Sequence, residues 1–137
     1  MAGKGLWLRS IVLGAVVLVA TGAAGHAFDG DDVLKLKTTK RCRSCNLSAA
    51  DLAAATLAGA DLAGADLSGA NLTGADLSGA RLFHADLTGA NLTGADLTAA
   101  KLVDADLAGA NFSSARLAAA LWTDGRTCAP DSIGACK

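Results

Sequence analysis

The stretch ADLSGANLTGADLSGARLFH, residues 65–84, is made of four five-residue units, three of which read Ala-Asp/Asn-Leu-x-Gly. Units of this form follow one another without insertion or deletion from Cys45 to Asp124, which is 80 residues or sixteen units. The central residue of a unit is leucine except at Phe112 and Trp122, and alanine stands two residues before each centre except in the first unit, where Cys45 replaces it. The repeat therefore decides the fold.

A period of five fits neither regular secondary structure. On an α-helix, a step of five residues rotates the side chain by about 140°, so the leucines would not form one apolar face. On a strand, an odd period places successive leucines on opposite faces. The chain must instead turn once per unit, with alanine and leucine pointing inward on a short extended piece. The glycine that follows suits a turn with positive φ.

These units resemble the pentapeptide-repeat family, and Ala65-Asp66-Leu67-Ser68-Gly69 matches its repeat almost letter for letter. The resemblance implies an all-β fold, a right-handed quadrilateral β-helix with four units to a coil and about four coils in this chain. A second period supports that count, because residues 65–84 match residues 85–104 at 14 of 20 positions. Residues twenty apart are therefore expected to stack on one side of the solenoid.

The flanks divide the chain into four predicted segments: a signal peptide (1–27), an N-terminal cap (28–41), the β-helix (42–124) and a C-terminal cap (125–137). Residues 29–40 are expected to form a short helix that covers the first coil, because acidic residues open this segment and basic residues close it. A bare solenoid end would otherwise offer unpaired edges to other chains.

The first 27 residues have the pattern of an export signal. Lys4 and Arg9 precede an apolar run, and a small-x-small sequence ends at Ala27. The run is short for a transmembrane anchor, which is the alternative, so we expect no stable membrane insertion after cleavage. Export predicts an oxidising location: the periplasm, the exterior or, in a cyanobacterium, the thylakoid lumen.

Four cysteines lie at the two ends of the repeat. Cys42 and Cys45 form a CxxC at the junction with the cap, where we favour a disulfide over a redox-active pair. Cys128 and Cys136 are predicted to form a second disulfide that closes the tail. The two pairs are too far apart to share one zinc ion, and Trp122 is expected to act as a lid on the bore.

One side of the solenoid departs from the repeat. We call it the fourth side; its column of outward residues is Asp61, Arg81, Lys101 and Leu121. The irregular residues collect there and form the candidate interaction surface, with two cations, two exposed apolar groups and a contact between a histidine and an aspartate: Arg81, Phe83, His84, Lys101, Val103 and Asp104. The other reading is that relaxed corners simply tolerate such residues. The resemblance suggests that the Asp and Asn columns of the remaining sides form hydrogen-bond ladders to neighbouring backbone and to hydroxyls, which Ser68, Thr73, Thr88, Thr93 and Thr98 offer.

The sequence favours a non-enzymatic exported scaffold or protein-interaction module. No nucleophile is paired with a base and no second histidine is available for a metal after residue 27, so we expect no catalytic residue, metal or cofactor. Residues 28–137 carry 10 Lys and Arg against 13 Asp, which does not suggest a nucleic-acid partner. The alternative is a DNA-mimic inhibitor or topoisomerase-protection protein, a role known in the resembling family, but Arg81, Lys101 and Arg116 interrupt the acidic columns. A thiol-redox role for the CxxC is a third hypothesis.

Overall fold

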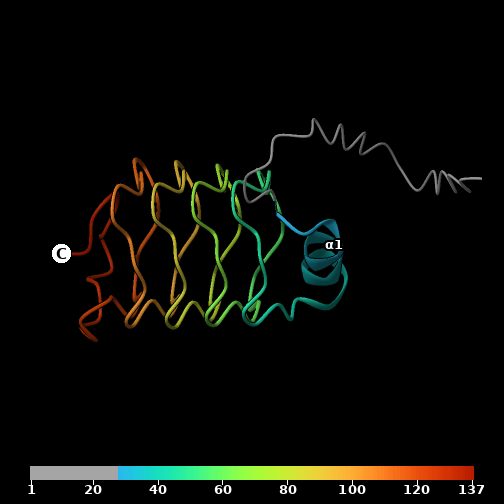
Figure 1. Ribbon diagram of the computed structural model, residues 1–137. Coiled ribbons are helices and arrows are strands. Elements are labelled where there is room, and N and C mark those ends of the chain that lie inside the picture. The colour runs from blue at the N-terminus through green and yellow to red at the C-terminus, as the bar shows by residue number, and fades with distance from the viewer. Residues whose placement is uncertain (1–27) are drawn as a thin grey trace, which may run out of the picture.

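The computed structural model describes residues 28–137, and the predicted signal peptide (1–27) lies outside these residues. The chain winds into a stack of coils, with α1 at one end and the C-terminus at the other (Figure 1). Short extended pieces pair in parallel between coils, and each parallel pair joins residues twenty positions apart, from Arg41 with Asp61 to Lys101 with Leu121. The stacking interval is the one that the sequence predicts.

The core is a column of leucine and alanine side chains. Leu67, Leu72 and Leu77 are fully buried, as is the alanine that follows each of them by three residues. Each unit closes with a turn in which that alanine's amide donates to the preceding leucine carbonyl, as from Ala70 to Leu67 at 3.0 Å. The residue before the alanine is then left-handed, with φ of +64° at Gly69. The five-residue period thus comes from one turn per unit.

Helix α1 spans Gly30–Thr39 and lies against the first coil (Figure 1). Its N-cap is Asp29, whose carboxylate accepts a hydrogen bond from the amide of Asp31 at 2.9 Å, and its C-cap is Lys40, which is left-handed with φ of 55°. Leu36 is its buried residue and belongs to the same core as the leucines of the repeat. Among residues 28–137, no helix is long and apolar enough to cross a bilayer.

The tail covers part of the opposite end. It pairs in antiparallel fashion with two residues of the last units, Ile133 with Arg116 and Thr127 with Leu121. Leu107 on another side is only half-buried, although Leu67 and Leu87 below it are fully buried. Trp122 is half-buried, packs against the core and contacts Phe112. The tail and the aromatic pair together therefore cover part of this end and leave the unit of Leu107 more open.

The Asp and Asn columns bond to neighbouring backbone amides and hydroxyls, as expected, but most of these bonds stay within one unit and do not run from coil to coil. Their side-chain oxygens mostly accept from the residue two positions later in the same unit, as Asp66 does from the amide and hydroxyl of Ser68. A side-chain bond between coils joins Asn71 to Asp51 at 3.1 Å. The local bond prevails because it closes within one turn, whereas successive carboxylates stacked 20 residues apart repel each other.

Candidate functional site

The fourth side is held by backbone pairing between adjacent coils. Arg81 pairs in parallel with Lys101, and the amide of Leu82 donates to the carbonyl of Lys101 at 2.8 Å. The amide of His84 donates to the carbonyl of Val103 at 3.1 Å. The structure therefore brings the six predicted surface residues onto two neighbouring coils of one side: Arg81, Phe83, His84, Lys101, Val103 and Asp104.

Arg81 and Phe83 form a mixed cationic and aromatic contact. The guanidinium carbon of Arg81 lies 5.8 Å from the centre of the Phe83 ring. A cation at this distance from an aromatic face gains about 0.5–1 kcal/mol at an exposed site. Phe83 and Val103 are half-buried, so the expectation of two exposed apolar groups was only partly right. Packing against the corner covers part of each side chain and leaves the rest open to a partner.

His84 and Asp104 meet across two coils. The Nδ1 atom of His84 lies 3.8 Å from an Oδ2 atom of Asp104, and the two side chains are 71% and 64% exposed. Such an exposed pair contributes little to stability, about 0–1 kcal/mol, and is ionic only while the imidazole is protonated. Both residues are left-handed, with φ of 55° and 58°, at the position where eight of the sixteen units have glycine. The fold thus accepts a conformational cost at both residues.

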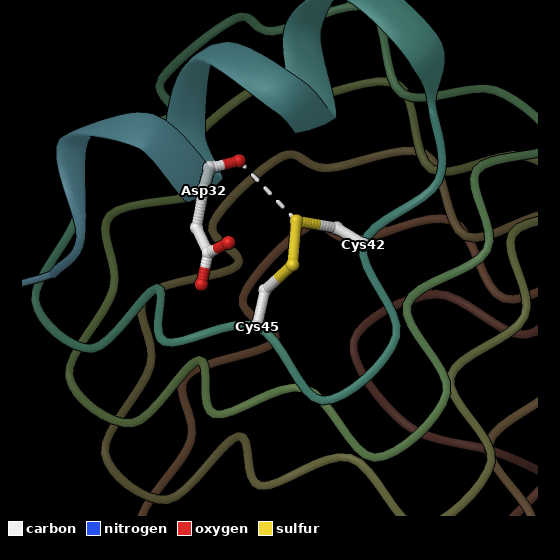
Figure 2. Close-up of side chains that lie close together, drawn as sticks. All are labelled: Asp32, Cys42 and Cys45. Carbon is white, nitrogen blue, oxygen red and sulfur yellow. Dashed lines mark hydrogen bonds between the residues drawn. A yellow bond between two sulfur atoms is a disulfide. The ribbon is translucent and has the colours of Figure 1, made fainter.

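The CxxC forms a buried bracket beneath α1. Cys42 and Cys45 are joined by a disulfide, with Cα atoms 5.3 Å apart, and the two residues are 0% and 3% exposed. Figure 2 shows the pair beside Asp32, whose carbonyl oxygen lies 3.2 Å from Cys42 Sγ and whose carboxylate accepts from the amide of Asn46 at 2.9 Å. The bridged sulfurs carry no proton, so the 3.2 Å approach is a packing contact.

The same three residues have the geometry of a partial metal site. One ligand atom from each of Asp32, Cys42 and Cys45 lies within 4.8 Å of the others. A disulfide sulfur is not a thiolate, however, and thiolates are what a zinc site of this kind needs. Burial also keeps the disulfide away from an attacking thiol, which is unfavourable for a redox role. The arrangement fits a structural bracket that fastens α1 to the repeat.

The second disulfide joins Cys128 to Cys136, with Cα atoms 4.9 Å apart. It lies in the tail, where Cys128 is buried and its amide donates to the carbonyl of Ala120 at 2.8 Å. Among residues 28–137 all four cysteines are disulfide-bonded and His84 is the only histidine. No cysteine in this part of the chain is thus free to act as a nucleophile.

A charged hollow at the N-terminal end of the fourth side was missed by reasoning from sequence. It has a volume of about 460 Å³ and is lined by residues of α1, the junction and the first coils: Lys35, Arg41, Arg43, Asp61 and Arg81. Arg41 pairs with Asp61 and so extends the fourth-side column by one coil towards α1. Applying the twenty-residue interval one step before the repeat would have placed Arg41 there. Helix α1 supplies Lys35, which no period in the sequence locates.

Asp61 is the carboxylate of this hollow. The Nε atom of Arg43 donates to its Oδ2 at 2.6 Å, and the Asp61 side chain is 20% exposed. Burial raises the pKa of Asp61, but the hydrogen bonds from Arg43 and from the amide of Ala63, with the charges of Arg43 and Arg81, outweigh burial and lower the pKa below 3.8. Asp61 therefore stays ionised at neutral pH and holds Arg43 in place.

Comparison with known proteins gives consistent matches to one fold. The sequence profile of pentapeptide repeats, in eight copies, matches residues 45–82 and 80–118. The structure is similar to that of HetL, a pentapeptide repeat protein involved in heterocyst differentiation regulation in the cyanobacterium Nostoc, with 44% identity and a TM-score of 0.63. That match covers 64% of this chain and 40% of HetL, so the chain spans about two fifths of the length of HetL.

Two further structures extend the comparison. A second pentapeptide repeat protein from Nostoc is 35% identical over 66% of this chain and 81% of its own, with a TM-score of 0.50. A pentapeptide repeat protein from the Arabidopsis thaliana thylakoid lumen is 28% identical over 82% of this chain and 92% of its own, with a TM-score of 0.43. No match to this sequence is found among curated proteins. The family match and the two Nostoc structures imply a right-handed β-helix.

Proposed function

Because the chain belongs to the pentapeptide-repeat family, we propose that it is an exported, non-enzymatic scaffold that presents its fourth side to a protein partner. The observation that carries this proposal is the gathering of six irregular residues on adjacent coils of one side: Arg81, Phe83, His84, Lys101, Val103 and Asp104. The other sides keep the regular Asp or Asn surface at most positions.

The chemistry of this surface suits protein recognition. It combines two exposed cations with two half-buried apolar groups, and the Arg81–Phe83 contact presents a planar cation beside an aromatic ring. Arginine and aromatic residues are enriched in the energetically important part of protein interfaces. The stacked coils hold these groups on a backbone that is hydrogen-bonded at each corner, so binding requires little ordering of the surface.

The disulfides support the exported location. Cys42 is bonded to Cys45 and Cys128 is bonded to Cys136. Disulfides persist where thiol reductants are scarce, as in the periplasm or an equivalent lumen. The predicted signal peptide points the same way. Sequencing the N-terminus of the mature protein tests the location: a first residue at or near Phe28 is expected, and a full-length cytosolic product would contradict export.

A cross-linking experiment tests the surface. The exported fraction is treated with a short cross-linker, and captured proteins are compared between the wild type and the triple variant Arg81→Asp, Phe83→Ser and Lys101→Asp. The variant is expected to keep its circular dichroism and melting temperature and to lose the captured partner. A control variant, Arg116→Asp with Arg126→Asp, reverses one exposed arginine on the side of Asp76 and Asp96 and one in the tail. If the triple variant captures the partner as well as the control does, the fourth side is not the binding surface.

The alternative role as a DNA mimic is not favoured by the charges of the fourth side. A DNA mimic needs dense, continuous negative charge. Here the column runs Arg41, Asp61, Arg81, Lys101, so it has three cations and one carboxylate. A partner that normally binds the phosphate backbone would meet cations on this side.

A further inference from the structure

Four cations line the hollow between α1 and the fourth side. Lys35, Arg41, Arg43 and Arg81 surround Asp61, which leaves four positive charges against one negative charge, a local net charge of +3. The whole of residues 28–137 has a net charge of −3, from 10 Lys and Arg against 13 Asp. Positive charge is therefore concentrated at this place on an acidic protein.

One cation of the hollow already binds a carboxylate. Arg43 donates to Asp61 at 2.6 Å, so the site holds one carboxylate from the protein itself. Within residues 28–137, Lys35, Arg41 and Arg81 form no ion pair within 4.0 Å. Unpaired like charges repel one another, and carboxylates from outside would relieve that repulsion.

The spacing of the cations indicates an extended ligand. Arg41, Asp61 and Arg81 follow one another at one-coil steps, so Arg41 and Arg81 are two coils apart, and Lys101 continues the column by one more. At the usual strand spacing of about 4.8 Å, two coils correspond to roughly 10 Å. A single small anion would pair with both arginines only if their long side chains converged on it. Alternate side chains of an extended peptide are about 7 Å apart, so each arginine can pair with its own carboxylate.

Phe83 and Val103 beside the cations favour a peptide over other polyanions. They give the column an apolar margin that can contact peptide side chains. A nucleic acid would need a broader basic surface, but the adjoining column carries Asp66, Asp86 and Asp106. These carboxylates would repel phosphates that extend beyond the column.

We propose that this hollow is the docking site for an acidic, extended segment of a protein partner, whose carboxylates pair with Arg41 and Arg81. This rests on the proposed function in that it names the chemistry of the segment that meets the fourth side. Asp61 competes with the incoming segment, because its carboxylate occupies Arg43 and lies next to Arg81 in the column. Binding is electrostatic and weakens as the salt concentration rises.

The test measures binding of fluorescein-labelled octaglutamate to the purified full chain by fluorescence anisotropy at low ionic strength. The variant Arg41→Ser with Arg81→Ser removes two unpaired cations and leaves the Arg43–Asp61 contact in place. It is expected to weaken binding by about fivefold or more, since each exposed charge pair contributes up to about a factor of five. The matched control, Arg116→Ser with Arg126→Ser, removes two arginines outside the hollow and should change binding less than twofold.

Asp61→Asn gives a change of the opposite sign. Removal of the competing carboxylate frees Arg43 and should tighten octaglutamate binding by about threefold, within the range of one exposed charge pair. A loss of folding could not produce tighter binding, so this variant separates the proposed site from a general structural effect. Circular dichroism of each variant confirms that the fold is kept.

Three outcomes would overturn the acidic-segment proposal: no binding of octaglutamate, equal weakening in the control variant, or displacement by inorganic phosphate at constant ionic strength with the same midpoint as unlabelled octaglutamate. The last result would indicate a site for single anions. Each of these leaves the cross-linking test of the fourth side unaffected. Conversely, arginine-dependent octaglutamate binding combined with partner capture that survives the triple variant would retain the anion site and reject the proposed function.

Discussion

The rings of Phe112 and Trp122 lie with their centroids 5.5 Å apart and their planes inclined by 60°. They stand at the inward positions of two units in the last part of the repeat, where leucine occupies the other fourteen units. Both are half-buried and pack against the leucine core. The pair therefore covers the end of the bore that lies away from α1.

Trp122→Ala is expected to destabilise the protein by about 2 kcal/mol, less than the roughly 3–5 kcal/mol of a fully buried aromatic residue. The loss comes from exposing the end of the core and from breaking the ring contact, which contributes about 0.5–1.5 kcal/mol. Urea unfolding followed by circular dichroism measures it. Trp122→Phe serves as the control and should lose less than half as much, because an aromatic ring remains. Equal stability of Trp122→Ala and the wild type would show that the pair does not cap the core.

Leu77→Ala and Leu107→Ala test whether the last coil is packed as tightly as the middle of the stack. Leu77 is fully buried between coils, so its truncation is expected to cost about 2–5 kcal/mol. Leu107 is half-buried, because the tail does not pair with its unit, and the same change there should cost clearly less. Both values come from urea unfolding. Similar losses at the two positions would mean that the last coil is as well covered as the middle of the stack.

Gly79→Ala isolates the conformational cost of the corner. Gly79 has φ of +64°, and a Cβ added there would meet no heavy atom within 4 Å. The expected loss of about 1 kcal/mol, or about 4 °C in melting temperature, comes from the left-handed backbone alone. Ala99 lies one coil later at the same corner with φ of +56°. Ala99→Gly should therefore not destabilise the protein, and a loss in that variant as large as in Gly79→Ala would refute a backbone origin.

Asp76→Asn probes stability against pH. The hydrogen bonds from the Ser78 hydroxyl and amide, at 2.6 and 3.0 Å, lower the pKa of Asp76 below 3.8. Because folding lowers this pKa, ionised Asp76 stabilises the protein fully above pH 3.8, and the contribution is lost as the pH falls below 3.8 through the folded-state value. Asn91 makes the same two bonds to Thr93, so asparagine fits the position.

The measurement is the difference in unfolding free energy between wild type and Asp76→Asn from pH 7 to pH 2. We expect the wild type to be the more stable at pH 7 and the difference to shrink below pH 3.8. The same substitution in a Ser78→Ala background is the control, where the pH-dependent part should be smaller because the hydroxyl donor is gone. A difference that does not change with pH would contradict the lowered pKa.

The repeat alone determined the family and the stacking interval. A period of five excludes a helix with one apolar face and a half-buried strand, and the match between residues 65–84 and 85–104 predicts stacking at twenty, as the parallel pairs show. The same interval by itself predicts Arg81 beside Lys101 and His84 beside Asp104, and the structure has both pairs. A strict period turns sequence separation into spatial position, which ordinary globular sequences do not allow.

Tertiary structure decided what lies outside the period. Helix α1 has no register with the repeat, so only its packing through Leu36 brings Lys35 over the fourth side and forms the hollow around Asp61. The direction of the Asp and Asn side chains was likewise decided by competition between a bond within the unit and one between coils, and the nearer donor prevailed. The tail covers the sides of Arg116 and Leu121 through antiparallel pairs. The repeat does not predict these pairs, because the tail lies outside it and is placed by the packing of Cys128 against the last units.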